Sequence, residues 1–527
     1  MKIRSDILRI YKSLHTWVGI GAGMLLFIGF FAGALTMFKH PLEHWASAPS
    51  PLLVHVQNID ALVSNLVIQH PQTRKEFTLH LEQNEQTITP VTWSAENGDH
   101  ALLLSANISH AWIDTSGTLQ MREQLPSLLG ELIDMLHRTA GIPTVIGGEY
   151  LGTYLMGVAG VMYFLALMSG VILLLPTLVK DFFALRAGKN PKRFWLDAHN
   201  VIGIASLPYH IVISLTVIVF AFHDQFYDSL AGVVYGKQPM FGAPPARVSE
   251  PYNIENLLPA TTLIHRIQQE APEFTITKLV YIALESPRAV VRAAIKSPRH
   301  MVQRADTGYV MINPYTGAIT NTSMLPGKEN SWSKLITPFF ALHFGSYGGD
   351  LVRWVYFFLG LSGAFLFYSG NLLWIESRRK QQKNATEPIV QRKATHLMAA
   401  ATVGICLGSM AGVLSTLAAA KWLSNLPGNI NLSYVNVYYS VFLFAVAWSF
   451  WCGAGRAAVH ILTLCALASL AIPLTSLLAI FIPKLGLWAH ASTLSVDLTA
   501  LIAAGLFAYA ARLTSRRIAQ SVDSVWS

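Results

Sequence analysis

The sequence contains few cysteines and lacks the common metal and nucleotide motifs. Its three cysteines form neither a Cys-x-x-Cys nor a Cys-x-x-Cys-His motif. This excludes a disulfide framework, a zinc ribbon and covalently attached c-type haem, but it leaves non-covalent haem open. A His-Glu-x-x-His motif is also missing, and no Gly-x-Gly-x-x-Gly fingerprint follows a predicted strand. We therefore expect neither a zinc-protease site nor NAD(P)H binding by this chain.

Charged residues are also scarce. They make up 13% of the 527 residues, which is about half of the roughly 25% that is usual in soluble domains. Hydrophobic residues make up 52% and form several runs of the ~20 residues needed to cross a bilayer. The sequence therefore predicts a polytopic α-helical membrane protein, in contact with lipid, with about eight transmembrane helices. The predicted spans are 17–38, 150–175, 200–222, 351–375, 397–419, 434–452, 457–482 and 493–511.

Lysine and arginine are distributed unevenly between the loops. They gather in the N-terminal segment, in the loops 177–197 and 376–396, and after the sixth and eighth spans. All of these segments fall on one side if the spans alternate, and the positive-inside rule makes that side the cytoplasm. Both termini are then cytoplasmic. The net charge of +9 follows from this topology, and we expect no nucleic acid as a partner.

Two long polar segments, 40–146 and 223–348, are predicted on the outer side. Each begins with a helical pattern, at 59–71 and 261–274. Short strands bounded by turn residues follow in both segments, which indicates two small α+β domains. The predicted strands are 76–83, 101–107 and 110–120 in the first segment and 277–285, 289–296 and 308–320 in the second.

Residues 1–380 have the pattern of a tandem duplication. "LHTWVGIGAG" opens the first span and "AHNVIGIASL" opens the third, while "LHRTAGIPTVIGGE" precedes the second and "LHFGSYGGD" precedes the fourth. Ser169-Gly170 matches Ser369-Gly370 inside the second and fourth spans. Repeated halves of membrane proteins commonly build a shared site where they meet. Residues 396–512 are predicted to form a separate four-span block.

Histidines occupy equivalent places in the two repeats. His15 and His199 lie at the cytoplasmic mouths of spans one and three, and His137 and His343 come just before spans two and four. His210 lies deeper, eleven residues after His199, which is within ~20° of three full turns in a straight helix. Interfacial histidines are often only hydrated side chains. The repeated set with an intramembrane fifth member favours axial ligation of haem iron.

The small residues beside these histidines have two explanations. Gly19, Gly21 and Gly23 follow His15, and Gly203 follows His199. They leave room either for a flat macrocycle or for close helix packing, and the sequence does not decide between them. A non-haem metal site is the weaker alternative, because the spans contain no cluster of carboxylates.

Taken together, these motifs resemble the PepSY-associated transmembrane helix family of bacterial iron-regulated inner-membrane proteins. The resemblance covers roughly residues 5–378 and depends on "LHTWVGI", "LHRTAGIP", "MSGVILL", "DAHNVIGIASLPYH", "INPYTGAIT" and "LHFGSYGGDLVRWVYFFLGLSG". It implies a multi-pass protein of the bacterial inner membrane with two PepSY-like periplasmic domains. It also implies two b-type haems, and reduction of ferric iron held by a siderophore on the periplasmic side. By this resemblance the iron ligands are His15, His137, His199 and His343.

The expected architecture and function are then as follows. His15 with His199 holds a haem on the cytoplasmic side, and His137 with His343 holds one near the outer face, while His210 replaces a ligand or lies between the haems. Electrons come from a cytoplasmic reductase or from quinol. Two alternatives stay open, a siderophore or iron transporter component and a PepSY-type envelope regulator without redox activity. The predicted segments are 1–39 (first span), 40–146 (domain 1), 147–222 (spans two and three), 223–348 (domain 2), 349–378 (span four) and 396–512 (C-terminal block).

Further residues near the outer face have alternative roles. Arg353 is expected either to pair with a haem propionate, which suits the guanidinium geometry, or to extend to the membrane interface. Aromatic side chains near the membrane are expected either to contact the chelate or to form the interfacial aromatic belt. These aromatic residues are Trp332, Phe339, Phe340 and Tyr347.

Overall fold

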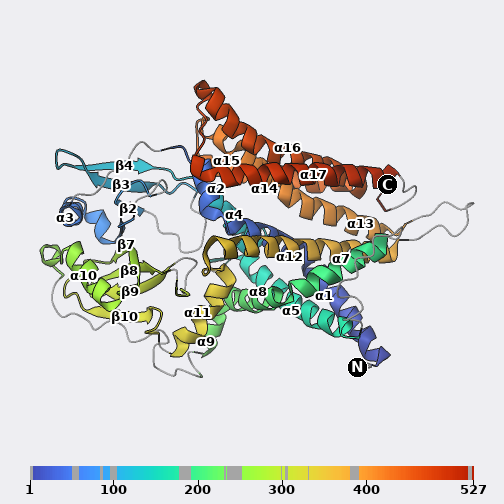
Figure 1. The fold of residues 1–527 in the computed structure, drawn as a ribbon, viewed down its shortest axis with the longest axis horizontal. Coiled ribbons are helices and arrows are strands. Elements are labelled where there is room, and N and C mark those ends of the chain that lie inside the picture. Colours follow the sequence, from blue (N-terminus) through green and yellow to red (C-terminus); the bar gives the residue numbers. More distant parts are fainter. Residues whose placement is uncertain are drawn as a thin grey trace, which may run out of the picture.

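The protein consists of a long bundle of helices with a β-sheet at one end (Figure 1). Both chain termini lie at the opposite end of the bundle. We refer to these ends as the sheet end and the terminal end. The computed structural model describes residues 4–49, 58–82, 87–94, 104–146, 148–176, 178, 191–230, 233, 252–297, 299–302, 307–329, 331–379, 391–519 and 525–526.

Seven helical segments in the described part of the chain are long and apolar enough to cross a membrane. This confirms the predicted polytopic helical fold. The segments are α1 (Ser5–Thr36), α5 (Leu151–Leu174), α12 (Gly349–Arg378), a composite Lys393–Leu423, α15 (Ile430–Cys452), α16 (Ala454–Phe481) and Ala491–Ala519. The composite contains α13 (Lys393–Thr402), the π-helical turn η4 (Val403–Leu407) and α14 (Gly408–Leu423), and the last segment contains η6 (Ala491–Thr493) and α17 (Leu494–Ala519).

The third predicted span is broken into two helices. The pair α7 (Pro191–Ala205) and α8 (Leu207–Ala221) bends by 74°, and counting the pair as one span gives eight. Pro208 cannot donate a backbone hydrogen bond to the preceding turn, and just before it both the backbone N–H and the hydroxyl of Ser206 donate to the Ile202 carbonyl. The assumption of a straight helix through His199 and His210 is therefore wrong, because the two histidines lie on different helix axes.

The two repeats pack together as a core of spanning helices. Helix α1 packs against α5 and α12, while α5 packs against α8 and α12 packs against α7. Gly160 and Gly360, which match across the repeat, allow two of these close approaches. A Cβ atom on Gly160 would lie 2.7 Å from Val217, and one on Gly360 would lie 3.0 Å from Ala34. Small residues at such crossings let helix backbones approach closely.

The two predicted α+β domains share one antiparallel sheet. Its order is β10-β9-β8-β7-β1-β2-β3-β4, so β1 and β7 join the two halves at the centre. Residues 101–103 of the predicted strand 101–107 lie outside the described residues, and residues 104–107 form no strand. The second strand of the sheet, β2, lies earlier in the chain. The strands are β1 (Glu76–His80), β2 (Val91–Ser94), β3 (Ile108–Ile113), β4 (Leu119–Gln124), β7 (Thr275–Ile282), β8 (Val290–Lys296), β9 (Gly308–Ile312) and β10 (Ile319–Met324).

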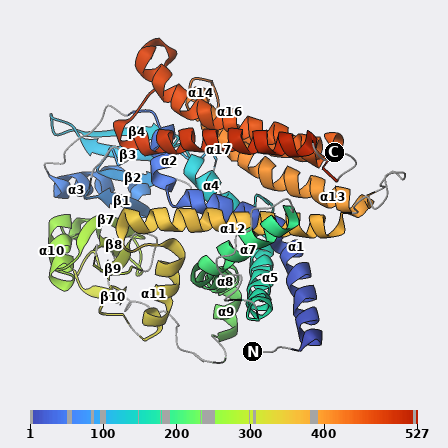
Figure 2. The same ribbon diagram turned by 45° about the vertical axis from the view of Figure 1, so that its right-hand side comes forward.

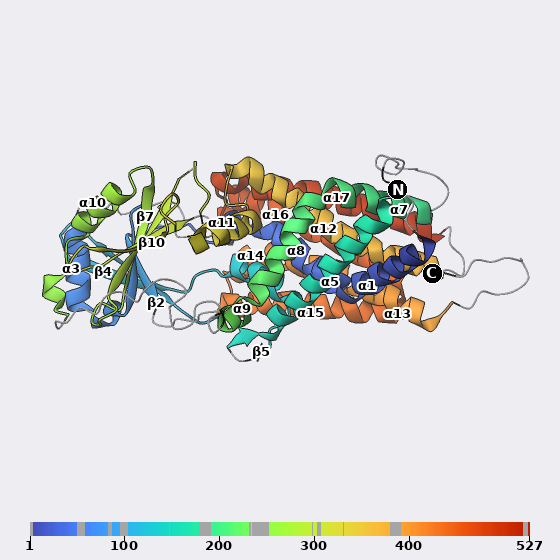
Figure 3. The same cartoon turned by 90° about the horizontal axis from the view of Figure 1, so that it is seen from below.

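One face of the sheet is covered by two helices. Helices α3 (Ile59–Gln69) and α10 (Ala260–Glu270) bury their apolar faces against alternate strand residues such as Leu79 and Tyr281. Figure 3 shows α3 and α10 on the side of the sheet that points away from the spans. The other face of the sheet therefore looks toward the ends of the spanning helices.

Short elements connect the sheet to the bundle. Helix α4 (Leu129–Thr139) leads into α5, and α11 (Ser331–Phe344) leads into α12. Helix α2 (Lys39–Ala46) follows α1, and α9 (His223–Leu230) follows α8. The remaining short elements are β5 (Val145–Ile146), β6 (Glu149–Tyr150), η1 (Pro71–Arg74), η3 (Ile254–Asn256) and η5 (Pro483–Leu485).

The C-terminal block lies along α12, on the side away from α5, α7 and α8 (Figure 2). A buried polar network fixes it to α2. The fully buried Lys421 of α14 donates to the Ser476 hydroxyl and to the Trp488 carbonyl, and its ammonium lies 3.9 Å from the ring centre of Trp45. Asp497 accepts hydrogen bonds from Trp45 and Ser476. Such a network is stabilising when its members are satisfied.

Candidate functional site

The first histidine pair lies toward the terminal end of the core. His15 comes from α1 and His199 from α7, and their ring centres are 6.3 Å apart. His15 Nδ1 lies 2.8 Å from the carbonyl oxygen of Ala166. His199 Nδ1 lies 3.0 Å from the hydroxyl of Ser369. The bonded partners belong to α5 and α12, so all four elements of the repeat position this pair.

The second pair lies at the sheet end. His137 comes from α4 and His343 from α11, and their ring centres are 6.1 Å apart. His137 Nδ1 lies 2.7 Å from the carbonyl oxygen of Gly29, and His343 Nδ1 lies 2.8 Å from the hydroxyl of Thr216. The structure thus brings together the two pairs that the repeat symmetry predicts.

These hydrogen bonds fix the same tautomer in all four rings. A carbonyl oxygen only accepts, so His15 and His137 each donate through Nδ1–H. The hydroxyls of Ser369 and Thr216 donate to backbone carbonyls within their own helices. Their oxygens therefore accept from the ring nitrogens. Each imidazole keeps its Nε2 lone pair available, as in the metal-binding histidines whose other ring nitrogen is held by a hydrogen bond.

The supporting bonds repeat as well as the histidines. In each pair one ring bonds a backbone carbonyl directly, and the other bonds a side-chain hydroxyl. Ser369 donates to the carbonyl of Leu366, which is the repeat counterpart of Ala166. Thr216 also bonds the carbonyl of Ile213, the counterpart of Gly29. In the second repeat a side-chain hydroxyl therefore lies between the histidine ring and the backbone carbonyl, both at His199 and at His343.

The ring separations fit two imidazoles that share one iron. An imidazole nitrogen binds a first-row metal ion at about 2 Å and lies about 1 Å from its ring centre, so the two ring centres are roughly 6 Å apart. No group of three or more His, Cys, Asp or Glu residues that could hold a metal ion occurs within the described ranges. Each pair thus offers two protein ligands, the number that a haem iron takes in bis-histidine ligation.

The glycines beside the rings divide into two kinds. Gly19 has no atom of the described residues within 4 Å of its Cβ position, and its counterpart Gly203 has only Leu366, at 3.8 Å. Gly21 and Gly23 instead lie against side chains of α5 and α12 at 2.5 and 3.2 Å. Gly19 and Gly203 therefore leave space one turn from the first pair, as a flat macrocycle requires, whereas Gly21 and Gly23 serve helix packing.

Other glycines make room for the imidazoles themselves. A Cβ on Gly33 would lie 2.6 Å from Nδ1 of His137. The matched Gly170 and Gly370 face the rings of His15 and His199 at 3.1 and 3.6 Å. The repeated Ser-Gly motif thus contributes directly to the first pair, through a hydroxyl and a glycine on adjacent residues.

His210 belongs to neither pair. Its Nδ1 is hydrogen-bonded to the Tyr163 hydroxyl, and its ring lies among those of Phe30, Tyr163 and Tyr209. The side chain is 1% exposed, and Nε2 finds no partner within the described part of the chain. The role of His210 as an alternate iron ligand stays a prediction.

The structure places Arg353 near the sheet end of α12. Its guanidinium forms an exposed ion pair with Asp350 at 3.4 Å, one turn earlier. Of the aromatic residues expected near the membrane, Phe340 packs on Phe220, whose ring also contacts His343, and the Tyr347 hydroxyl bonds that of Tyr356. The side chain of Trp332 lies outside the described residues.

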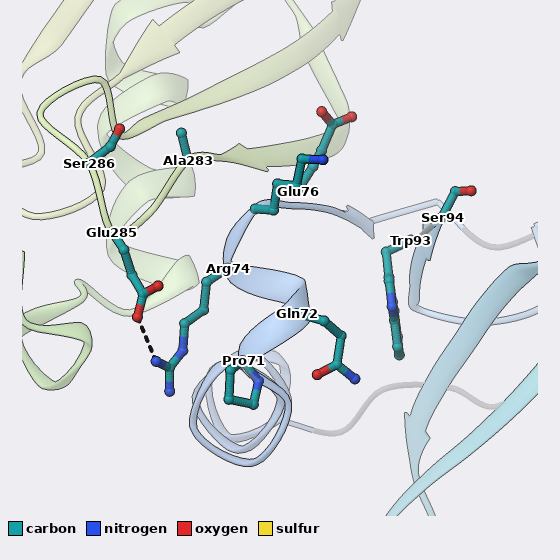
Figure 4. Close-up of a pocket in the computed structure, with 10 residues that line it drawn as sticks. Pro71, Gln72, Arg74, Glu76, Trp93, Ser94, Ala283, Glu285 and Ser286 are labelled. Atoms are coloured by element: carbon teal, nitrogen blue, oxygen red, sulfur yellow. Dashed lines mark hydrogen bonds and ion pairs between the residues drawn. The ribbon is translucent and has the colours of Figure 1, made fainter. Parts of the chain in front are cut away.

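A pocket opens beside η1, where the two halves of the sheet join (Figure 4). It has a volume of about 400 Å³, and Trp93, Glu76 and Arg74 line it. Arg74 forms an ion pair with Glu285 at 2.6 Å across the junction. This contact ties the first half of the sheet to the second.

Several supporting residues are not predictable as site residues from the sequence alone. Thr216 and Tyr163 lie in apolar spans without a repeated counterpart, so no pattern marks them. Ser169-Gly170 and Ser369-Gly370 are visible as repeats, but their contact with the histidines is not. The role of the Ala166 and Gly29 carbonyls cannot be recognised from the sequence, since every residue carries a backbone carbonyl.

The sequence matches the model of a known protein family. A family model described as the PepSY-associated TM region matches residues 12–377, which is more than half of the chain. No curated protein matches the sequence.

Proposed function

The chain belongs to the family of the PepSY-associated TM region, and from the histidine pairs within that region we propose that it is a transmembrane electron-transfer protein of the bacterial inner membrane. In this proposal it binds two b-type haems and reduces the ferric iron of a siderophore on the periplasmic side. Reduction lowers the affinity of hard oxygen donors for the metal, which follows from ligand softness.

The observation that carries the proposal is the repeated Nδ1–H tautomer at two histidine pairs. Each pair has a ring separation suited to one iron, and the pairs lie toward opposite ends of the same helical core. Haem, when bound, supplies an iron that gains and loses one electron. His15 with His199 would hold one such iron and His137 with His343 the other, and two protein ligands on each iron favour electron transfer over oxygen binding.

The other residues of the core would keep each ligand in place. Ser369 and Thr216 hold the rings of His199 and His343 by accepting a hydrogen bond from Nδ1–H. The carbonyls of Ala166 and Gly29 do the same for His15 and His137. The lysines and arginines of the N-terminal segment support a cytoplasmic terminal end, so electrons from a cytoplasmic reductase or quinol would travel toward the sheet end.

A transporter component is the second candidate, because one observation favours it. Lys421, Ser476 and Asp497 form a buried polar network inside the C-terminal block, and polar residues within spans often mark a transport path. The network is fully hydrogen-bonded at Lys421 and joins the block to Trp45, which also explains it as a structural contact. The regulator alternative has no comparable support and leaves the paired histidines without a role.

An absorption spectrum of the purified full-length protein tests the proposal. The dithionite-reduced form should show a sharp α-band that the oxidised form lacks, and a pyridine haemochrome assay should count about two haems per chain. Adding a ferric siderophore should then reoxidise the reduced protein. A protein that stays colourless after haem is supplied would contradict the proposal and would favour the transporter component instead.

A further inference from the structure

The centre of the sheet presents a group of basic residues toward the spans. Lys278 on β7 lies directly opposite His80 on β1 and opposite Ala294 on β8. Arg292 lies two residues before Ala294 on the same face, and Tyr309 on β9 is opposite Ala294. Side chains alternate between the faces of a strand. The side chains of Lys278, His80, Arg292 and Tyr309, which we call the basic seam, therefore point away from the core under α3 and α10.

The two cations of the basic seam have no acidic partner among the described residues. No ion pair within the described part of the chain involves Lys278 or Arg292. Arg292 has its guanidinium 5.0 Å from the ring centre of Tyr309, and its buried Nε has no hydrogen-bond partner among the described residues. Other cations of the same outer region are paired, Lys296 with Glu82 and Lys328 with Glu270.

The seam gathers positive charge on one face of the sheet. Lys278 and Arg292 are diagonal neighbours on β7 and β8, and the buried Nε of Arg292 is a donor without an acceptor, which costs free energy. His80 avoids adding a third charge, because burial first and then Lys278 lower its pKa to about 4. Its Nε2 is hydrogen-bonded to the Thr92 hydroxyl. The seam therefore keeps two positive charges and one neutral imidazole side by side at neutral pH.

The position of the seam adds a second observation. β1 belongs to the first repeat and β7 to the second, so the seam lies where the two halves meet, as shared sites in duplicated proteins commonly do. The face that carries it looks toward the end of the bundle where α11, the helix of His343, lies (Figure 3). A ligand bound there would lie between the sheet and the second histidine pair.

We infer that the basic seam binds the iron substrate, and that this substrate is an anionic ferric chelate with carboxylate or catecholate groups; the inference rests on the proposed function and names its substrate class. Arg292 offers a fork that matches carboxylate geometry, and Lys278 offers a point charge beside it. Tyr309 holds the guanidinium plane through the cation–π contact. A neutral or cationic chelate gains nothing from these groups.

Binding of a redox-inert analogue tests the inference on the full-length protein. The probe is gallium(III) citrate, measured by isothermal titration calorimetry in detergent, with a neutral gallium(III) trihydroxamate for comparison. K278Q and R292Q should each weaken citrate-complex binding by about tenfold, as expected for loss of one charge-assisted contact. Raising the salt concentration should weaken it further. K328Q is the matched control, because it removes a cation that already has an acidic partner, Glu270.

The outcomes separate this inference from the proposed function. Gallium(III) is not reduced, so binding is read without electron transfer, and haem content is measured on the same samples. Equal affinity of wild type, K278Q and R292Q would overturn the inference, as would preference for the neutral chelate. The wild-type protein could contain no haem and still bind the citrate complex. If K278Q and R292Q then lost that binding, the result would support the basic seam as the binding site and overturn the proposed reductase function. R292K is a second variant in case R292Q does not fold, and it should bind more weakly than wild type because it lacks the fork.

Discussion

The Thr216 hydroxyl accepts a hydrogen bond from Nδ1 of His343 at 2.8 Å while it donates to the Val212 carbonyl of its own helix. This double role fixes the His343 tautomer without any charged group. Ser369 does the same for His199 at the other pair. Two different residue types in different helices thus provide one chemical function, which indicates that the orientation of the rings matters to the protein.

Replacing Thr216 by valine should loosen the hold on haem at the sheet end. The variant keeps the shape of the side chain but removes the acceptor for His343 Nδ1–H, and loss of such an outer contact typically costs 10–100-fold in affinity. The rate of haem transfer to an excess of apomyoglobin measures this. T463V is the matched control, because the Thr463 hydroxyl bonds only the Val459 carbonyl in its own helix. Equal transfer rates for T216V and T463V would contradict the assigned role.

Gly33 should tolerate no side chain beside His137. A Cβ atom there would lie 2.6 Å from the ring nitrogen, closer than a van der Waals contact, so the ring must move. We expect G33A to retain about one haem per chain instead of about two, because the first pair is untouched. The pyridine haemochrome assay gives this count. G505A serves as the control, since its Cβ position has no described atom within 4 Å, and a full haem count in G33A would show that His137 does not hold haem.

Lys421 should stabilise the attachment of the C-terminal block. Replacing Lys421 leaves the Trp488 carbonyl without its donor, and a buried polar group that loses its partner typically costs about 1–3 kcal/mol. K421M should therefore lower the free energy of unfolding and the melting temperature in detergent. K484M is the control, because Lys484 lies exposed after α16. The haem count of K421M should stay unchanged, and an unchanged melting temperature would mean that the network contributes little.

The sheet should lose stability in mildly acidic solution. His80 has a pKa lowered from 6.5 to about 4 by burial, Lys278 and His110, so the unfolded chain binds more protons than the folded one between these values. Stability is then complete above about pH 6.5 and decreases as the pH falls toward 4. Hydrogen exchange of the β1 and β7 amides at pH 7.5 and 5.0 should reveal this.

The same experiment has a simple control. H80Q should reduce the loss of protection at low pH, because glutamine does not titrate. The exposed His265 on α10 provides H265Q, which should behave like wild type. If H80Q remained as acid-sensitive as wild type, another group would have to explain the pH dependence.

The spans, the duplication and the histidine pairs are predictable from the sequence. Apolar runs and repeated motifs are local signals, and the repeat alone relates His15 to His199 and His137 to His343. The pairing of strands between the two repeats is not predictable in this way. The junction of β1 with β7 joins strands nearly two hundred residues apart, and no periodicity reports which edges meet.

Three other features are also not predictable from the sequence. The 74° break at Ser206 was missed because a proline inside an apolar run is tolerated in membrane helices, so Pro208 did not mark an end. The short strand β2 (Val91–Ser94) was missed because four residues give too little alternation to recognise. The Lys421 network was missed because its members are far apart in the sequence.

The haem count of single and double histidine variants tests the central claim most directly. The account predicts about two haems for wild type and for H210A, and about one for H15A, H199A and the double variant H15A/H199A. The double variant H15A/H343A, with one change in each pair, should retain none. A double variant H15A/H199A without haem, or an H15A protein that keeps two haems, would contradict the assignment of each pair to one iron.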